Sequence, residues 1–391
     1  MPKTIRMFIA VAVVVTFAAA AAVTGSGGAA VAAGPHGNGH AANNGGVLHV
    51  AANGSDANDC TGGAPCLTIS HAVSIAPGGA RVLVRGGTYA EQVTITKQVS
   101  LEAAGQVTID ATGKINGIVV SGAGASGTSI SGFSVENAIG EGILVMSTSN
   151  VTVRHNTLTH NDTGVNTTVT PECAPSGEIP GDCGEALHLM SVTNSSVFGN
   201  DIEHNVGGIL ITDELGPSRF NVIADNTTSN NAEDCGITLP SHNGAAVADP
   251  SMGGVYNNII VHNVSDNNGG AGVGMFAPFP GTASYNNLVV GNSVRNNGEA
   301  GVGIHAHAPG QNVSGNVIMD NRVSGNGVDP DAGSGGPVGI ALFSAVDPQT
   351  EVVRGNHIDN EMWGIFIAGP VTVTGIGSNH FGGSVTNATN Q

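Results

Sequence analysis

The sequence predicts an all-β solenoid, in which short strands stack as successive turns of one coil. The most regular stretch is NIIVHNVSDNNGGAGVGM, from Asn258 to Met275, and its pattern returns at least six more times between Asn150 and Ile367. Each copy has two Asn residues five positions apart, then a small residue or Gly, then a strand with alternating apolar residues. The chain also has 60 Gly among 391 residues and only 10% charged residues, which suits many short strands joined by tight turns. We therefore expect one elongated repeat domain, because a solenoid lengthens without starting a new core.

The paired Asn residues fall into two columns when the repeats are stacked. Successive members of the first column are 26 to 44 residues apart, which indicates a basic turn of about two dozen residues with insertions of different length. A buried Asn at a turn can hydrogen-bond from turn to turn and tolerates left-handed backbone, so we predict two structural ladders rather than ligand or glycosylation sites. The first column comprises Asn156, Asn200, Asn226, Asn263, Asn292, Asn321 and Asn356, and the second comprises Asn161, Asn205, Asn231, Asn268, Asn297 and Asn326.

Residues 1–33 have the pattern of a secretory signal peptide. The basic segment MPKTIR precedes an apolar run and then the small residues AAVAAG, which predicts cleavage near Ala32 or Ala33. A retained membrane anchor is the alternative, but Thr16 and the many Ala residues make the run weak for a membrane span. We expect a secreted, extracellular protein with no membrane attachment after cleavage, and a flexible linker at residues 34–46.

Five Cys residues follow the signal segment. In an oxidising compartment, their short separations favour a Cys60–Cys66 and a Cys173–Cys183 disulfide, although spacing by itself leaves the pairing open. Cys235 is then left over. It begins a repeating strand where other repeats carry small residues, which favours a packed thiol over a reactive nucleophile.

A short helix is predicted before the first turn of the coil. Residues 68–76 carry apolar side chains at helical spacing, and the PGG sequence that follows ends the helix. We expect this helix to cover the end of the stack, where the first turn otherwise exposes its core and an open strand edge.

Several segments occur together in this region: GSD, the P-x-x-TI that opens the predicted helix, PGG, and VRGGTYAEQVTI. With the Asn and Gly turns behind them, they resemble secreted right-handed parallel β-helix proteins of the pectin-lyase-like superfamily, over roughly Val47 to Phe381. The resemblance implies a single-stranded right-handed parallel β-helix of roughly ten turns at residues 47–385.

The same resemblance implies a carbohydrate-active protein, because the superfamily includes polysaccharide lyases, hydrolases and uronate epimerases. A non-catalytic extracellular surface or adhesive protein is the alternative, since many members have no established reaction. In either case we expect a monomer whose partner is a polysaccharide or a cell-surface glycan.

Insertions interrupt the repeats, and most leave from the same end of the repeating strand. We therefore expect them to stand on one side of the coil and to wall a groove beside the outward-facing columns, which is the usual place for function in repeat proteins. The insertions comprise residues 165–184, 240–255, 277–285, 306–313 and 328–337.

Candidate catalytic residues lie beside these insertions, at the sixth position after the Gly that opens each repeating strand. Glu214 and His242 fall on adjacent turns, and His307 falls two turns further, roughly 10 Å from His242. We assign His242 to proton transfer because an imidazole titrates near neutral pH, and an adjacent Glu214 favours its protonated form. Arg219 would contact the sugar or a developing oxyanion, and His307 a neighbouring sugar unit. The alternative is that all four are solvated turn residues.

Further residues are expected to contact the substrate. Tyr256 and Tyr285 should be neighbours in one column, where aromatic rings either stack on sugars or pack under loops. The chain has no closely spaced Asp set of the polygalacturonase kind and no D-P-H-D of the mannuronan epimerases, so the enzyme assignment rests on analogy and on this constellation. The predicted substrate-binding residues are His188, Asp213, Phe276, His305, Tyr256 and Tyr285.

The net charge limits the partners. The formal value is −18, and removing Lys3 and Arg6 with the signal segment leaves 9 basic against 29 acidic residues, or −20. Such a chain repels nucleic acid, and it repels polyuronates unless cations bridge them. Acidic pairs at 213–214, 233–234 and 329/331 could hold Ca²⁺ through oxygen ligands, although the nonapeptide Ca²⁺ repeat is absent and solvated charge is the simpler interpretation. No other cofactor is predicted.

Overall fold

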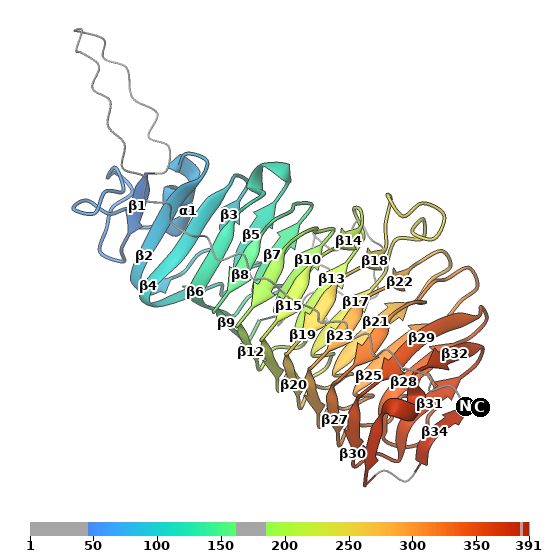
Figure 1. Ribbon diagram of the computed structural model, residues 1–391. Helices are drawn as coiled ribbons and strands as arrows, with labels where there is room; N and C mark the ends of the chain where they lie inside the picture. Colours follow the sequence, from blue (N-terminus) through green and yellow to red (C-terminus); the bar gives the residue numbers. More distant parts are fainter. Residues whose placement is uncertain (1–45, 162–184, 384–385, 391) are drawn as a thin grey trace, which may run out of the picture. The chain divides into compact units, whose positions relative to one another are not determined.

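The computed structural model describes residues 46–161, 185–383 and 386–390, and these ranges form a solenoid of parallel strands (Figure 1). Equivalent strands of successive turns pair in register, so each sheet runs along the coil. This is the all-β, right-handed parallel β-helix that the sequence predicts. The strands continue through the predicted end of the domain to residue 390.

Three sequence predictions fall outside the described residues. They are the signal peptide at 1–33, the insertion at 165–184 and the Cys173–Cys183 disulfide, and of the linker only residue 46 is described. Within the described ranges, no helix has the length and hydropathy needed to cross a membrane.

An eleven-stranded parallel sheet, counting the described strands, forms the face that carries the candidate site. Inward side chains of its strands, such as Ile237 and Leu239, are fully buried in one continuous core, as the alternating pattern predicts. Outward positions align from turn to turn, so Phe276 lies beside His305 of the next turn. The strands are β3 (Val93–Ile95), β5 (Ile118–Ser121), β7 (Ile143–Met146), β10 (Leu187–Met190), β13 (Ile209–Thr212), β17 (Ile237–Pro240), β21 (Val273–Ala277), β25 (Val302–Ala306), β28 (Val338–Ser344), β31 (Trp363–Ala368) and β34 (Thr386–Asn390).

A second sheet, with twenty of the described strands, covers the other faces of the coil. It consists of two stacks, which separate where β6 (Ser129–Glu136) pairs with both β8 (Thr152–Arg154) and β9 (Thr157–Thr159). The remaining strands are β1 (Val47–Val50), β2 (Ala80–Tyr89), β4 (Val99–Asp110), β11 (Ser196–Phe198), β12 (Asp201–Glu203), β15 (Val222–Ala224), β16 (Thr227–Ser229), β19 (Ile259–Val261), β20 (Val264–Asp266), β23 (Leu288–Val290), β24 (Ser293–Arg295), β26 (Val317–Met319), β27 (Arg322–Ser324), β29 (Gln349–Arg354), β30 (His357–Asp359), β32 (Val371–Thr374) and β33 (His380–Gly382).

A small third sheet of the described region consists of β14 (Ser218–Arg219), β18 (Val255–Tyr256) and β22 (Ser284–Tyr285). Along the chain, each of its strands comes after a strand of the eleven-stranded sheet (β13, β17 or β21) and before the next strand of the second sheet. In the described part of the chain, 3₁₀ helices occupy Ala123–Ala125 and Ile376–Ser378.

The predicted capping helix is present as α1 (Ile69–Ile75). Thr68 is the N-cap residue rather than the first helical residue, and its hydroxyl accepts a hydrogen bond from the His71 backbone N–H of the first turn. The Glu91 carboxylate accepts from the first two backbone N–H groups of the helix, each at 2.8 Å, where a negative charge is favoured. The buried Ile69 and Val73 belong to the same core as the strands, so the helix closes the N-terminal end of the stack.

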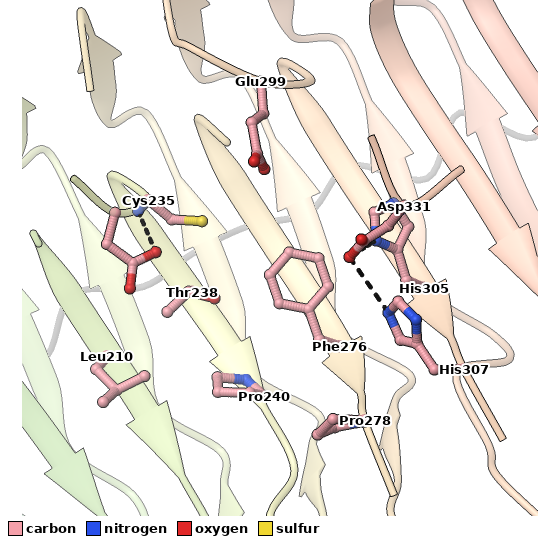
Figure 2. A pocket seen from close by; sticks show the side chains of 11 residues that line it. Leu210, Cys235, Thr238, Pro240, Phe276, Pro278, Glu299, His305, His307 and Asp331 are labelled. Atoms are coloured by element: carbon pink, nitrogen blue, oxygen red, sulfur yellow. Dashed lines mark hydrogen bonds and ion pairs between the residues drawn. The ribbon is translucent and has the colours of Figure 1, made fainter. Parts of the chain in front are cut away.

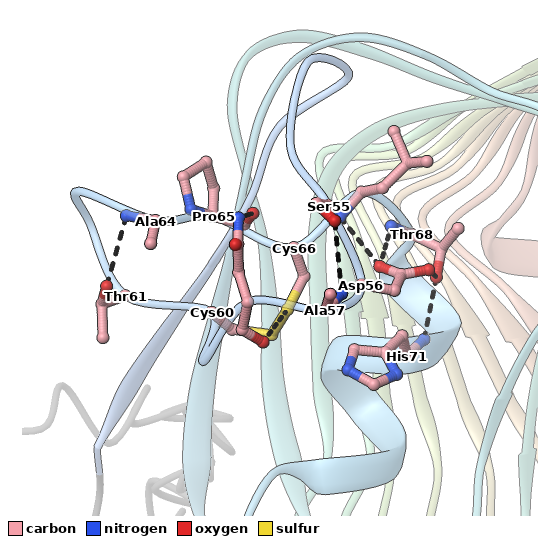
Figure 3. The surroundings of a disulfide bond; sticks show 12 residues. Ser55, Asp56, Ala57, Cys60, Thr61, Ala64, Pro65, Cys66, Thr68 and His71 are labelled. Carbon is pink, nitrogen blue, oxygen red and sulfur yellow. Dashed lines mark hydrogen bonds between the residues drawn. A yellow bond between two sulfur atoms is a disulfide. The ribbon is translucent and has the colours of Figure 1, made fainter.

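The loop before α1 contains the predicted Cys60–Cys66 disulfide, whose Cα atoms are 4.6 Å apart (Figure 3). In the same loop, the Asp56 carboxylate accepts hydrogen bonds from the Leu67 and Thr68 backbone N–H groups at 2.8 and 2.9 Å. The disulfide and this carboxylate together tie the loop to the start of the helix.

Both predicted Asn ladders are present and buried. In a typical step, the Nδ2 atom and the backbone N–H of Asn226 both donate to Asn263 Oδ1, at 3.0 and 2.9 Å. From the sequence we expect left-handed backbone at the ladder Asn, but in the structure it occurs at the residue before each Asn. His262, for example, has a φ of 55°. The corner residue turns the chain, and the Asn after it can then point its side chain along the stack.

A third Asn ladder was not predicted. Asn221 Nδ2 donates to Asn258 Oδ1 at 3.0 Å, and Asn258 Nδ2 donates in turn to Asn287 Oδ1 at 3.1 Å. Asn287 Nδ2 continues the ladder to Asn316 Oδ1 at 3.2 Å. Insertions of variable length precede this corner, which hides the column when the repeats are compared as sequence.

Candidate functional site

A cleft of about 200 Å³ opens on the outward face of the eleven-stranded sheet, over strands β17, β21 and β25 (Figure 2). Outward side chains of these strands form its floor, and residues of the turns before them form one wall. This is the face on which the sequence predicts a groove. The lining residues are Leu210, Asp234, Cys235, Thr238, Pro240, Phe276, Pro278, Glu299, His305, His307 and Asp331.

Two glycines lie against the Phe276 ring, which lines the cleft. Gly274 and Gly303 pair at outward positions of β21 and β25, and a Cβ atom at Gly274 would lie only 2.4 Å from the ring of Phe276. The Phe276 ring can fold over the strand only because Gly274 has no side chain there. The Phe276 ring therefore contributes an apolar surface to the cleft, on which a flat apolar face can pack.

One end of the cleft is a cluster of imidazoles and carboxylates. His305 is 3% exposed, and its Nε2 atom is hydrogen-bonded to Asp329 Oδ2 at 2.9 Å. Its other ring nitrogen, Nδ1, lies 3.8 Å from Asp331 Oδ2, and His307 Nε2 lies 3.7 Å from the same oxygen. Both carboxylates come from the 328–337 insertion.

The environment shifts the pKa values of this cluster in opposite directions. Burial acts to lower the pKa of His305, but its hydrogen bond to Asp329 and the nearby Asp331 carboxylate outweigh burial and raise the pKa to about 9. Burial and the charge of His305 lower the pKa of His307. The interaction with His305 lowers the pKa of Asp331.

Glu299 stands on the turn before β25, and its carboxyl group points into the cleft (Figure 2). Burial, together with the negative charges of Asp329 and Asp331, raises its pKa to about 7. At neutral pH, roughly half of the Glu299 side chains therefore carry a proton. The sequence predictions missed Glu299. One signal was available, because Glu299 is a charged residue at the position at which the preceding turn has Gly270. The Glu299 backbone N–H donates to Gly270 O at 3.1 Å.

Cys235 is a free, buried cysteine on the wall of the cleft, as the sequence predicts for a packed thiol. Burial raises its pKa well above the usual range, and the nearby Asp234 acts in the same direction. The thiol is therefore protonated at neutral pH, which disfavours a nucleophilic role.

Comparison with known proteins agrees with this architecture. A family model described as a right-handed β-helix region matches residues 107–277, and one described as a protein of unknown function (DUF1565) matches residues 52–131. The chain therefore has the right-handed parallel β-helix fold. No curated protein sequence matches this β-helix protein.

Solved structures share the fold at low sequence identity. Pectate lyase Pel9A has a TM-score of 0.55 and 17% identity, over 88% of this chain and 78% of that chain. The A-module of the Azotobacter vinelandii mannuronan C-5 epimerase AlgE4 has a TM-score of 0.51 and 13% identity, over 80% and 89%. The tailspike protein of E. coli bacteriophage HK620, solved in complex with a pentasaccharide, has a TM-score of 0.51 and 14% identity, over 78% and 61%. At such identities the likeness establishes the fold alone.

In this β-helix protein, Glu214 and His242 meet as predicted, but neither lines the cleft. Glu214 Oε1 and His242 Nδ1 are 2.8 Å apart, and each side chain is only 1% exposed. The Thr212 hydroxyl donates to the other Glu214 oxygen and is hydrogen-bonded to His188 at 2.8 Å, while His188 lies 3.3 Å from Glu141. The predicted pair and the predicted His188 thus belong to a buried chain of polar groups that crosses several turns. Their roles in catalysis and substrate binding stay predictions.

Asp213 is fully buried rather than directed toward a ligand. Its Oδ2 atom accepts hydrogen bonds from the Ser241 hydroxyl at 2.8 Å and from Gly254 N, and its Oδ1 atom accepts from His242 N at 2.6 Å. Burial raises its pKa despite these donors. In this position Asp213 fastens both ends of the 241–254 loop to the coil.

Tyr256 and Tyr285 are column neighbours, as predicted, with ring centroids 4.9 Å apart. Arg219 extends the column, because its Nη1 atom donates to the Tyr256 hydroxyl at 2.9 Å. Tyr256 is 6% exposed, and its hydroxyl also donates to Pro250 O of the overlying insertion. The column therefore supports the insertion, and Arg219 directs its guanidinium to Tyr256 rather than to the Glu214–His242 pair.

Three predicted residues do come together in the cleft: Phe276, His305 and His307. The ring centroids of Phe276 and His305 are 5.2 Å apart, and those of His305 and His307 are 5.6 Å apart. Their partners are Asp331 and Glu299 rather than the predicted Glu214 and His242. The site of this β-helix protein therefore lies on the predicted face but contains a different set of acidic residues.

Proposed function

We propose that this β-helix protein is a secreted, monomeric enzyme that hydrolyses a polysaccharide bound in the cleft, with Glu299 as the proton donor. Relatives of the same fold include a pectate lyase, a mannuronan epimerase and a tailspike protein solved with a pentasaccharide. Fold likeness is a weak guide to activity, so the proposal depends on the site itself.

The Glu299 carboxyl group is the observation that carries the proposal. A general acid must be protonated at the working pH and must still release its proton readily, and a pKa of about 7 meets both conditions. Hydrolysis of a glycosidic bond requires such a carboxylic acid to protonate the leaving oxygen. Glu299 points into the cleft above the Phe276 ring, where a bound sugar would lie between the two (Figure 2).

The charge of the cleft favours a neutral glycan over a polyuronate. Its lining includes the carboxyl groups of Asp234, Glu299 and Asp331, and none of its described lining residues is Lys or Arg. A polyuronate carries a carboxylate on each sugar, which these groups and the net charge of −18 repel. Hydrolysis of a neutral polysaccharide is therefore a better fit than the lyase or epimerase reactions, which act on uronates.

The test is to incubate the mature protein with a panel of neutral and acidic polysaccharides and to measure two products. New reducing ends report any cleavage, and ultraviolet absorbance reports the unsaturated uronates that a lyase releases. We expect reducing ends without absorbance, from a neutral glycan. Glu299→Gln should lower turnover by about 10²-fold or more.

Glu203→Gln is the matched control, because Glu203 lies on β12 in a different sheet and should leave turnover unchanged. Ultraviolet absorbance after incubation with a polyuronate would show that the reaction is elimination and not hydrolysis. A glycan that binds without cleavage would favour the alternative of a non-catalytic surface or adhesive protein. Full turnover in Glu299→Gln would remove Glu299 from the mechanism.

A further inference from the structure

Three side chains at the end of the cleft offer closely grouped metal-ligand atoms. His305, His307 and Asp331 each present one nitrogen or oxygen, and these atoms all lie within 4.8 Å of one another. Asp331 Oδ2 is 3.7 Å from His307 Nε2 and 3.8 Å from His305 Nδ1. Two ligands of a tetrahedral Zn²⁺ ion lie about 3.4 Å apart when each bond is about 2.1 Å long, so small side-chain rotations bring these atoms to bonding positions.

His305 has a ring nitrogen without a hydrogen-bond partner among the described residues. Its side chain is only 4% exposed, and the unpartnered atom is Nδ1, the one nearer to Asp331. Buried polar atoms are rarely left unpaired, so this nitrogen is a candidate ligand atom, and a metal ion that binds it displaces its proton to solvent. The other ring nitrogen is hydrogen-bonded to Asp329 at 2.9 Å. A carboxylate behind a metal-bound imidazole orients the ring and raises its basicity.

The supporting carboxylate is itself held in place. Asp329 is 2% exposed, and its Oδ1 atom accepts a hydrogen bond from Ala332 N at 2.9 Å. The Asp329 backbone N–H donates to the Ser334 hydroxyl at 3.0 Å. The same insertion presents Asp331 with a side chain that is 58% exposed and therefore free to adjust toward an ion. The predicted 329/331 pair thus places one carboxylate against the His305 ring and the other beside both imidazoles.

We propose that His305, His307 and Asp331 bind a divalent first-row transition metal ion, for which Zn²⁺ is the best fit. Two imidazole nitrogens favour such an ion over Ca²⁺, which takes about six to eight oxygen ligands. Three protein ligands leave one coordination position open, as in catalytic rather than structural zinc sites. His307 and Asp331 line the cleft, so the open position faces the space that Glu299 and Phe276 border. There the bound ion would supply Lewis-acid chemistry.

Calorimetric titration of the chelator-treated mature protein with ZnCl₂ tests the site without any glycan. We expect one ion per chain in the wild type, and at least about tenfold weaker binding in His307→Ala and in Asp331→Ala. Both side chains are partly exposed, at 30% and 58%, so the metal-free variants should unfold at the wild-type denaturant concentration. Zn²⁺ should raise the unfolding midpoint of the wild type more than that of either variant.

His204→Ala is the control, because His204 is an exposed imidazole that stacks on His160 at 6.1 Å in another sheet. It should bind Zn²⁺ like the wild type. The site is refuted if the wild type binds no Zn²⁺, if Ca²⁺ binds as tightly, or if His204→Ala weakens binding as much as the two ligand variants. This inference does not depend on the proposed function, since metal binding is measured without substrate and either result leaves the glycan test open.

Discussion

Replacing Asn263 by alanine, in the middle of the first ladder, removes four hydrogen bonds that connect neighbouring turns. Asn263 Oδ1 accepts from the backbone N–H and the Nδ2 atom of Asn226, at 2.9 and 3.0 Å. Its Nδ2 atom donates to Ile223 O at 2.9 Å and to Asn292 Oδ1 at 3.0 Å. Asn263 is 1% exposed, so water cannot take over these bonds unless the stack opens.

The four lost hydrogen bonds differ in their cost to the free energy of unfolding. Asn226 Nδ2 keeps its bond to Val197 O at 3.0 Å, and Asn292 Oδ1 still accepts the backbone N–H of residue 263 at 2.8 Å. The backbone N–H of Asn226 loses its acceptor, and the Ile223 carbonyl loses a donor. Each buried group left unsatisfied costs about 1–3 kcal/mol. Because partial relaxation of the turn recovers some of this, we expect Asn263→Ala to lower the free energy of unfolding by about 2–4 kcal/mol.

Denaturant unfolding followed by far-ultraviolet circular dichroism measures this loss. Asn53→Ala is the control, because Asn53 is exposed in the loop before the cap, and its unfolding midpoint should match the wild type. Asn379→Ala should fall between the two, because Asn379 is the partly exposed last member of the same ladder. The ladder reasoning is wrong if Asn263→Ala unfolds at the same denaturant concentration as Asn53→Ala.

Two further predictions concern buried carboxylates. Burial raises the pKa of Glu351 to about 9, so between about pH 5 and pH 9 the folded chain holds a proton that the unfolded chain releases. The free energy of unfolding should therefore fall as the pH rises through this range. Glu351→Gln should make the denaturant unfolding midpoint depend less steeply on pH, and an equal pH dependence in the two proteins would contradict this. Asp213→Asn should cost about 2–3 kcal/mol of stability and speed proteolysis of the 241–254 loop, because backbone donors lose their carboxylate partner. A loop that resists protease as well as the wild-type loop would show that Asp213 does not anchor it.

The sequence by itself determined the periodic features of this protein. The inward Ile237 and Leu239, the two predicted Asn ladders and the capping helix all depend on local spacing or on contacts between equivalent positions of neighbouring turns. Spacing of this kind is visible in the residues because a coil repeats it. The third ladder, which includes Asn258, escaped notice because insertions of unequal length precede it.

Only the tertiary structure decided the site. Register placed Glu214 beside His242 correctly, but it carried no information on the burial of that pair. Asp331 reaches the His305 and His307 imidazoles through an insertion whose path has no period, and the pKa of Glu299 depends on burial and on the charges that this insertion brings. Stacking determines which residues are neighbours along the coil. The folded insertions determine which of those residues are covered and which other side chains meet them, because their contacts link positions that no repeat relates.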